Sequence, residues 1–142
     1  MYAYFTPSTG SPQIALNDAS KVEEDFYNFT DRSTKEIQTA QFLRAGSVQT
    51  FDRGNEVTDI TAKFTKLFST LDAGTIWLVT TRAALSMVGL VKPYGKLTFV
   101  ARNFTGSTHN FDVHNACVTL TLERQIGVSF EFSIHVQGGR LI

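Results

Sequence analysis

The sequence predicts an α+β fold that is mainly β, an antiparallel β-sandwich or partly closed barrel with one flanking α-helix at about residues 70–86. From Val128 to Val136 apolar and polar residues alternate without an error. A period of two places every second side chain on the same face of a strand, so this segment buries one face and exposes the other to water. Residues 116–123 alternate in the same way, whereas helical periodicity is convincing in one stretch alone. Strands on both sides of a single helix indicate an α+β arrangement.

Length and composition suit one domain with neighbours. A chain of 142 residues can bury roughly two thirds of its unfolded surface without disulfides or metals. Charged residues make up 18% of it, against a usual value of about 25%, so the surface exposes more uncharged area than usual. Basic and acidic residues both number 13, which excludes a global attraction to nucleic acid or anionic membranes and favours self-association.

The first 19 residues are expected to form an N-terminal arm, flexible or docking, ahead of a single β-rich domain at residues 20–142. Pro7 and Pro12 lie there among Ser, Thr, Gly and Asn, a composition that disfavours regular structure. Clustered aromatic side chains at a terminus need a surface to pack on. Two interpretations stay open: the arm docks on a neighbouring subunit, or it folds back on its own domain. The aromatic residues concerned are Tyr2, Tyr4 and Phe5.

A hairpin is expected in the first half of the domain, after a short helix or turn at about residues 21–29 and a strand at residues 36–44. Its arms are residues 48–51 and 58–68, both rich in apolar and β-branched residues. The segment between the arms contains Gly and Asn, which tolerate the positive φ that tight hairpin turns require. The predicted turn consists of Asp52, Arg53, Gly54 and Asn55.

The period then changes to that of a helix. Ser69 and Asp72 resemble a capping box, and leucines recur at intervals of seven from Leu71. The helix should end before Gly89 and pack across the open face of the sheet. A strand at residues 96–104 and the C-terminal hairpin complete the domain, while the terminal Leu141 and Ile142 either dock on a neighbour or fray.

No group of residues predicts catalysis or a cofactor. Gly89, Gly95 and Lys96 lack the spacing of a phosphate-binding loop, and Leu97 follows the lysine where Ser or Thr is required. The carboxylates at positions 23–25 suit the N-terminus of a helix without any catalytic role. The basic and aromatic residues of segment 92–102 are too few to indicate nucleic-acid binding on a neutral protein.

The histidines and the single cysteine also favour structural roles. Asp112 and His114 would share one face of a strand, but a zinc site needs four ligands and a second pair is not visible. Cys117 lies three positions from His114, an odd separation that points the two side chains apart on a strand. We therefore expect a packed thiol. One cysteine and no signal-peptide pattern indicate a reducing cytoplasm, and Arg82 interrupts the most membrane-like segment, residues 75–91.

The order of these segments resembles a family. An N-terminal arm, a hairpin around Gly54, a strand that ends at Ser69 and Thr70, one helix and a C-terminal hairpin that closes on Gly138 and Gly139 are similar to the small tail proteins of bacteriophages. The resemblance covers about residues 35–140 and is to tail-tube, tail-terminator and head-to-tail adaptor subunits. It implies a β-sandwich or barrel with one helix that assembles into rings, usually sixfold, around a DNA channel. It also implies that the hairpin around Gly54 and the two termini contact other subunits.

We therefore expect a non-enzymatic structural protein of a virion, assembled in the host cytoplasm, whose partners are copies of itself and neighbouring virion proteins. DNA would pass through a lumen without sequence-specific binding. A capsid decoration protein is a close alternative. A different class is a soluble β-barrel that binds a small apolar ligand in an interior lined by phenylalanines, which predicts a monomer with a cavity. An enzyme would need isolated polar residues to find partners from distant segments.

Overall fold

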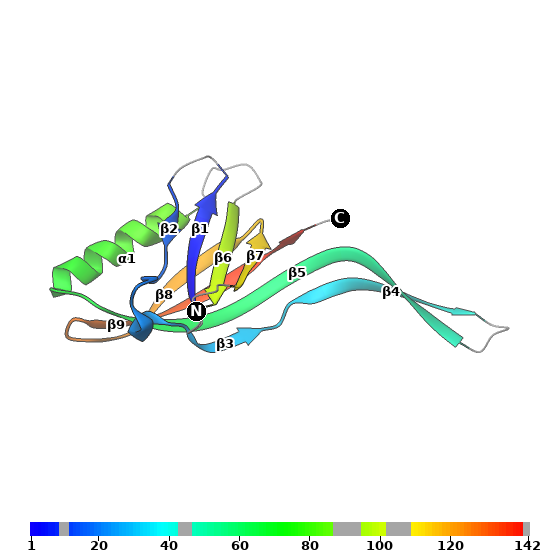
Figure 1. Ribbon diagram of the computed structural model, residues 1–142, viewed down its shortest axis with the longest axis horizontal. Helices are drawn as coiled ribbons and strands as arrows, with labels where there is room; N and C mark the ends of the chain where they lie inside the picture. Colours follow the sequence, from blue (N-terminus) through cyan, green and yellow to red (C-terminus); the bar gives the residue numbers. More distant parts are fainter. Residues whose placement is uncertain (9–11, 43–46, 87–94, 102–108, 141–142) are drawn as a thin grey trace.

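The computed structural model describes residues 1–8, 12–42, 47–86, 95–101 and 109–140, which form two antiparallel sheets and one α-helix (Figure 1). The elements, in chain order, are β1 (Tyr2–Pro7), β2 (Ile14–Ala15), a 3₁₀ turn η1 (Val22–Glu24), β3 (Tyr27–Asp31), β4 (Thr34–Phe42), β5 (Ser47–Leu67), α1 (Leu71–Leu85), β6 (Gly95–Ala101), β7 (His109–His114), β8 (Cys117–Ile126) and β9 (Ser129–Arg140).

The smaller sheet, sheet A, has the strand order β2-β1-β6-β7. β1 pairs along its whole length with β6, from Tyr2 opposite Val100 to Pro7 opposite Gly95. Ala3 and Phe5 point into the core and are fully buried. Of the two interpretations left open for residues 1–19, the first seven residues follow the second: they fold back on their own domain, where they form an inner strand of sheet A in place of irregular structure.

The larger sheet, sheet B, has the order β3-β5-β9-β8, and β4 pairs with the first half of β5. The C-terminal strand β9 lies between β5 and β8, and pairs with β5 without a register shift from Glu56 opposite Arg140 to Leu67 opposite Ser129. β8 pairs with β9 in the C-terminal hairpin that the sequence predicts, with Gly127 in the positive-φ conformation at its turn.

Alternation decides which face of sheet B is buried. In β9 the residues Phe130, Phe132, Ile134 and Val136 are at most 1% exposed, while the residues between them stay accessible. On β5 the same face carries Ile60, Ala62 and Phe64, and on β8 it carries Val118 and Leu120. This confirms the face assignment made from the sequence. We call this buried side the inner face and the opposite side the outer face.

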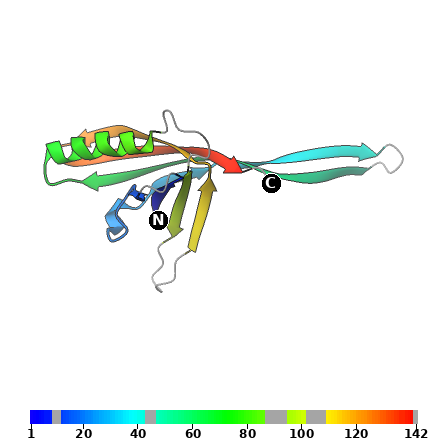
Figure 2. The same ribbon diagram turned by 90° about the horizontal axis from the view of Figure 1, so that it is seen from above.

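Sheet A and α1 lie side by side over the inner face (Figures 1 and 2). Phe99 of sheet A meets Phe26 edge to face, with ring centroids 5.8 Å apart, and Phe26 in turn meets Phe64 of sheet B at 5.5 Å. From the helix, Trp77 packs on Phe132 at 5.0 Å. The phenylalanines expected to line a ligand cavity therefore pack against one another, and edge-to-face pairs of this kind each stabilise the core beyond their buried area.

Helix α1 agrees with its prediction in position and length but not in its cap. The Thr70 side chain, rather than that of Ser69, accepts the N–H of Ala73 at 3.1 Å. Capping by a threonine stabilises a helix by about 1 kcal/mol. Of the short helix or turn expected at about residues 21–29, the turn is present: η1 forms a single 3₁₀ turn, and β3 begins at Tyr27. The residues that follow η1 form a strand and not a helix because they pair with β5, where Tyr27 lies opposite Lys63.

The fold is thus mainly β with one helix, as predicted. Of the two predicted architectures, a sandwich or a partly closed barrel, the structure agrees with the sandwich: the described strands form two separate sheets, A and B, and do not close into a barrel.

Candidate assembly surfaces

A two-stranded ribbon extends beyond the body of the protein, as Figures 1 and 2 show. It consists of β4 and the first half of β5, which pair from Thr34 opposite Val57 to Phe42 opposite Ser47. In the part of the chain that the structure describes, β4 pairs with β5 alone. A ribbon of two strands has only marginal stability in water. Neither sheet A nor α1 extends over this ribbon (Figures 1 and 2).

The predicted turn at Asp52–Asn55 is wrong. These residues lie inside β5, which is 21 residues long and continues through them. Lys35 pairs with Glu56 but Ile37 pairs with Asp52, so Arg53, Gly54 and Asn55 bulge opposite the single residue Glu36. Gly and Asn suit such an irregularity for the reason that they suit a turn, since both tolerate unusual backbone angles. The chain instead reverses between Phe42 and Ser47.

The outer face of sheet B is polar, and much of it is bonded across strands. His135 Nε2 lies 2.7 Å from Asp59 Oδ1, and the Ser133 hydroxyl donates to Glu123 Oε1 at 2.6 Å. Other hydroxyl side chains lie beside these pairs on the same face: Thr61 and Thr65 on β5, and Thr119 and Thr121 on β8. This face is broad and hydroxyl-rich, and α1 and sheet A leave it uncovered because both lie on the inner face.

Large apolar side chains are exposed around α1. Ile76 and Val79 on the helix are 65% and 63% exposed, and Leu71 at its start is 49% exposed. Beside it, Leu67 and Ile126 flank Ser129 on neighbouring strands and are 68% and 62% exposed. The outward side of a surface helix is usually charged or polar. This end of the molecule therefore has the composition of a contact surface.

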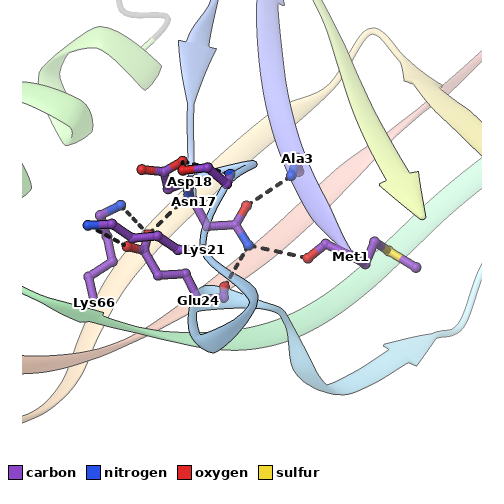
Figure 3. Close-up of polar contacts among 8 residues, drawn as sticks. Met1, Ala3, Asn17, Asp18, Lys21, Glu24 and Lys66 are labelled. Atoms are coloured by element: carbon purple, nitrogen blue, oxygen red, sulfur yellow. Dashed lines mark hydrogen bonds and ion pairs between the residues drawn. The ribbon is translucent and has the colours of Figure 1, made fainter. Parts of the chain in front are cut away.

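A buried polar cluster holds the N-terminal segment in place, as Figure 3 shows. Asn17 is 1% exposed. Its side-chain carbonyl accepts the N–H of Ala3 at 2.9 Å, and its amide donates to the Glu24 carbonyl at 2.7 Å and to the Met1 carbonyl at 3.3 Å. One amide thus joins β1 to η1. An unpaired polar group at such a position would cost about 1–3 kcal/mol.

Glu24 connects this cluster to sheet B. Its carboxylate is 4% exposed and lies 2.6 Å from the Lys66 ammonium on β5, and it also accepts the N–H of Asp18 at 3.0 Å. Lys66 in turn lies 4.9 Å from the Trp77 ring, a cation–π distance. From the sequence, Glu24 is expected near the N-terminus of a helix. The ion pair with Lys66 is not predictable from local patterns, because the two residues are 42 positions apart.

Two of the three aromatic residues predicted to contact subunits remain accessible. Tyr2 and Tyr4 are half-buried and line a groove of about 490 Å³ together with Lys66 and Trp77. Phe5 is 0% exposed in the protein's own core and cannot contact a neighbour. Of the other predicted contacts, residues 52–55 lie inside β5, and Leu141 and Ile142 lie outside the described residues.

Hydrogen bonding and burial shift two pKa values. The hydroxyl of Ser20, and then its backbone N–H, donate to the Asp18 carboxylate and lower the pKa of that group below its usual 3.8. Partial burial raises the pKa of Tyr27 above 10.0, although a hydrogen bond with Thr65 opposes the shift.

The candidate catalytic and metal residues do not come together. Asp112 accepts the Thr98 hydroxyl at 2.7 Å and lies 3.7 Å from the Lys96 ammonium. Among the described residues no three His, Cys, Asp or Glu side chains are placed to hold a metal ion. Cys117, expected to be packed, is exposed at the start of β8, so that expectation is wrong.

The described residues of the phosphate-loop and nucleic-acid candidates do not have the geometry that either role requires. Gly95 and Lys96 lie in a strand rather than in a loop before a helix, and Phe99 is fully buried and cannot stack on a base. Gly89, Lys92, Tyr94 and Arg102 lie outside the described residues.

Comparison with known proteins identifies no relative: no family model, curated protein or solved structure matches the chain. In the described part of the chain, α1 is too short and not apolar enough to cross a membrane.

Proposed function

We propose that this protein is a non-enzymatic structural subunit that assembles with copies of itself into rings, of the kind found in phage tails and head-to-tail connectors. The β4–β5 ribbon carries the proposal. It projects from the body with one edge of β4 unpaired among the described strands. Because isolated ribbons are marginal in water, a ribbon of this length is best explained as an element that other subunits cover.

Two further surfaces support assembly. The apolar residues exposed around α1, among them Ile76 and Val79, would lose contact with water in an interface. At about 25 cal/mol per Å² of apolar area, burial of several such side chains contributes substantially to association. Strand edges add main-chain hydrogen bonds, and alternating side chains fix their register. Contacts between two different surfaces repeat around a rotation axis and close into rings.

The outer face of sheet B is the face we place toward a central channel. Sheet A and α1 already cover the inner face, so it cannot line one. On the outer face the acidic residues Asp59, Glu123 and Glu131 outnumber the basic residues Lys63 and Arg124. DNA is held chiefly by cations that neutralise its phosphates. A hydroxyl-rich face with more carboxylates than ammonium groups would let DNA pass without holding it. In this proposal the protein is part of the virion and is assembled in the host cytoplasm.

The mass of the purified protein in solution, measured by light scattering with the same sample imaged by negative stain, tests the proposal. We expect rings or short tubes. In a matched variant, Asn-Gly replaces residues 36–55 and joins the paired residues Lys35 and Glu56, which removes the ribbon and keeps a two-residue hairpin turn. The variant should unfold cooperatively like the parent and remain monomeric. A parent protein that stays monomeric at high concentration, or a variant that still forms rings, would contradict the proposal.

A further inference from the structure

The outward edge of β8 is an open template for another strand. β8 is ten residues long, and among the described strands it pairs with β9 alone. Which of its peptide groups point outward follows from the hydrogen bonds of the neighbouring strands. Phe68 donates its N–H to the Val128 carbonyl, so the pair Leu67 and Ser129 is of the type without mutual hydrogen bonds.

Successive residues of a strand point their N–H and C=O groups to alternate sides, and this alternation can be followed from β5 through β9 to β8. Because β5 and β9 pair with no register shift, Ile134 directs its N–H and C=O toward β5. Its partner on the other side, Leu120, therefore directs its own N–H and C=O away from β9. Val118 and Leu122 have the same orientation. Three consecutive outward peptide groups thus lie in one row before the bulge that follows Leu122.

Arg82 occupies the middle of this row. Its Nε donates to the Leu120 carbonyl at 3.2 Å, from the last turn of α1. A groove of about 460 Å³ runs beside the strand, lined by Arg82, Leu85, Ser86 and the β8 residues 117–121. A volume of this size is within the range of ligand-binding clefts. The edge thus combines main-chain groups that have no partner strand in the described part of the chain, a groove beside them and a side chain on the central acceptor.

Of the two outer strands on the opposite side of the sheet, β4 fits this edge better than β3. β3 has five residues, and a register shift between Tyr27 and Thr30, with Asn28 at a φ of 51°, interrupts its edge. Bulges of this kind protect edges against pairing. β4 has nine residues, and from Ile37 to Phe42 it pairs with β5 without a shift. Its other edge is regular over that length.

We propose that β4 of a second copy adds to the outward edge of β8, and that Arg82 must leave the Leu120 carbonyl before it does. The inference rests on the proposed self-assembly and names its two complementary surfaces. The ribbon gains the sheet that it lacks, and β8 gains the partner strand that its outward peptide groups require. The contact joins two different surfaces, so it can repeat from copy to copy. Arg82 keeps the edge covered in the free subunit, which opposes premature association.

Binding of a β4 peptide to dilute protein tests the inference without requiring rings. The probe is a capped, fluorescein-labelled peptide of residues 34–42, followed by anisotropy. We expect Arg82→Met, which keeps the aliphatic stem and removes the donor, to bind about tenfold more tightly than the parent, since a charged donor no longer competes for Leu120. Arg124→Met changes an arginine elsewhere on β8 and should bind like the parent. A peptide with Gln38→Pro and Ala40→Pro, which lacks two main-chain donors, should bind much more weakly.

Equal binding of the proline peptide, or an Arg82→Met variant that binds no more tightly than the parent, would overturn the inference. A second test does not depend on Arg82: Thr39→Cys should form an intermolecular disulfide with Cys117 under mild oxidation, whereas Thr75→Cys on the exposed side of α1 should not. If rings form but the peptide neither binds nor slows their assembly, this inference fails and the proposed function stands. If the peptide binds as expected and the protein stays monomeric, the edge site stands and the ring proposal fails.

Discussion

Gly74 in α1 should not tolerate alanine, although helix propensity predicts the opposite. In a helix interior alanine is favoured over glycine by about 1 kcal/mol. At this position a Cβ would lie 2.5 Å from Phe130 Cζ, 2.6 Å from Phe130 Cε1 and 2.9 Å from Phe68 Cδ2. Phe130 is 1% exposed, and its ring stacks against Phe132 with centroids 5.9 Å apart, so it has little room to turn aside.

The magnitude follows from the two opposing effects. Overpacking a well-packed core by a methyl group typically costs about 1–3 kcal/mol, and distances near 2.5 Å to a confined aromatic ring place Gly74→Ala toward the upper end. Subtracting the propensity gain leaves a net loss of about 1–2 kcal/mol in the free energy of unfolding. Urea denaturation followed by the fluorescence of Trp77, the single tryptophan, which packs beside these rings, measures this directly.

Two further variants separate the effect of overpacking from that of helix propensity. Thr75→Ala lies one residue further on the exposed side of the same helix, where no such contact exists, and should increase stability by a few tenths of a kcal/mol through propensity alone. In a Phe130→Leu background the cost of Gly74→Ala should shrink, which a double-mutant cycle detects as coupling. A stability gain of about 1 kcal/mol from Gly74→Ala in the parent would refute the packing argument.

Further predictions concern the polar cluster and the core. Glu24→Gln removes the carboxylate that pairs with the Lys66 ammonium, and should lower the free energy of unfolding by about 2 kcal/mol or more, because the remaining charge is largely buried; equal urea midpoints for both proteins would disprove it. Phe132→Ala removes a fully buried ring from the centre of the core and should cost about 3–5 kcal/mol, and a cost below 1 kcal/mol would show that the ring is not packed as described. Ser20→Ala removes the main hydrogen bond that lowers the pKa of Asp18, so this pKa should rise toward 3.8 in an NMR titration. Because the folded pKa of Asp18 is the lower one, its contribution to stability is present above the unfolded pKa and is lost as the pH falls; an unchanged titration in Ser20→Ala would contradict the assignment.

Local periodicity was sufficient for the C-terminal half of the fold. The face assignment of β9 and the extent of α1 follow from alternation and helical spacing over adjacent residues, and neither depends on distant partners. The errors lie where long-range pairing decides the outcome. β1 becomes a central strand because β6 lies alongside it, some 95 positions away in sequence, and nothing in Tyr2–Pro7 itself indicates that partner. The bulge at Gly54 shows a related limit, because the residues that favour a turn also favour a bulge.

The candidate surfaces were only partly accessible to sequence reasoning. The aromatic pair Tyr2 and Tyr4 could be singled out, but burial of Phe5 depends on strand register, which flips with a shift of one residue. The Arg82 hydrogen bond to Leu120 joins residues 38 positions apart, and no motif marks it. Arg82 is nevertheless visible in the sequence as the single basic residue of a helix whose other charged residue is Asp72. The question of what this arginine contacts is the signal that could have led to the edge of β8.

The central place of β9 in sheet B has a consequence for the timing of synthesis. β5 and β8 meet through β9, which is synthesised after both of them. Until it arrives, the second half of β5 lacks its long hydrogen-bonded neighbour and β8 lacks its hairpin partner, so the body of the protein cannot close around its core. Sheets built from such distant pairings form slowly. The ribbon, by contrast, is formed by neighbouring segments and is complete at Val57, after about two fifths of the chain. A nascent subunit therefore presents its ribbon long before it has the finished edge to receive one, which separates chain completion from association in time.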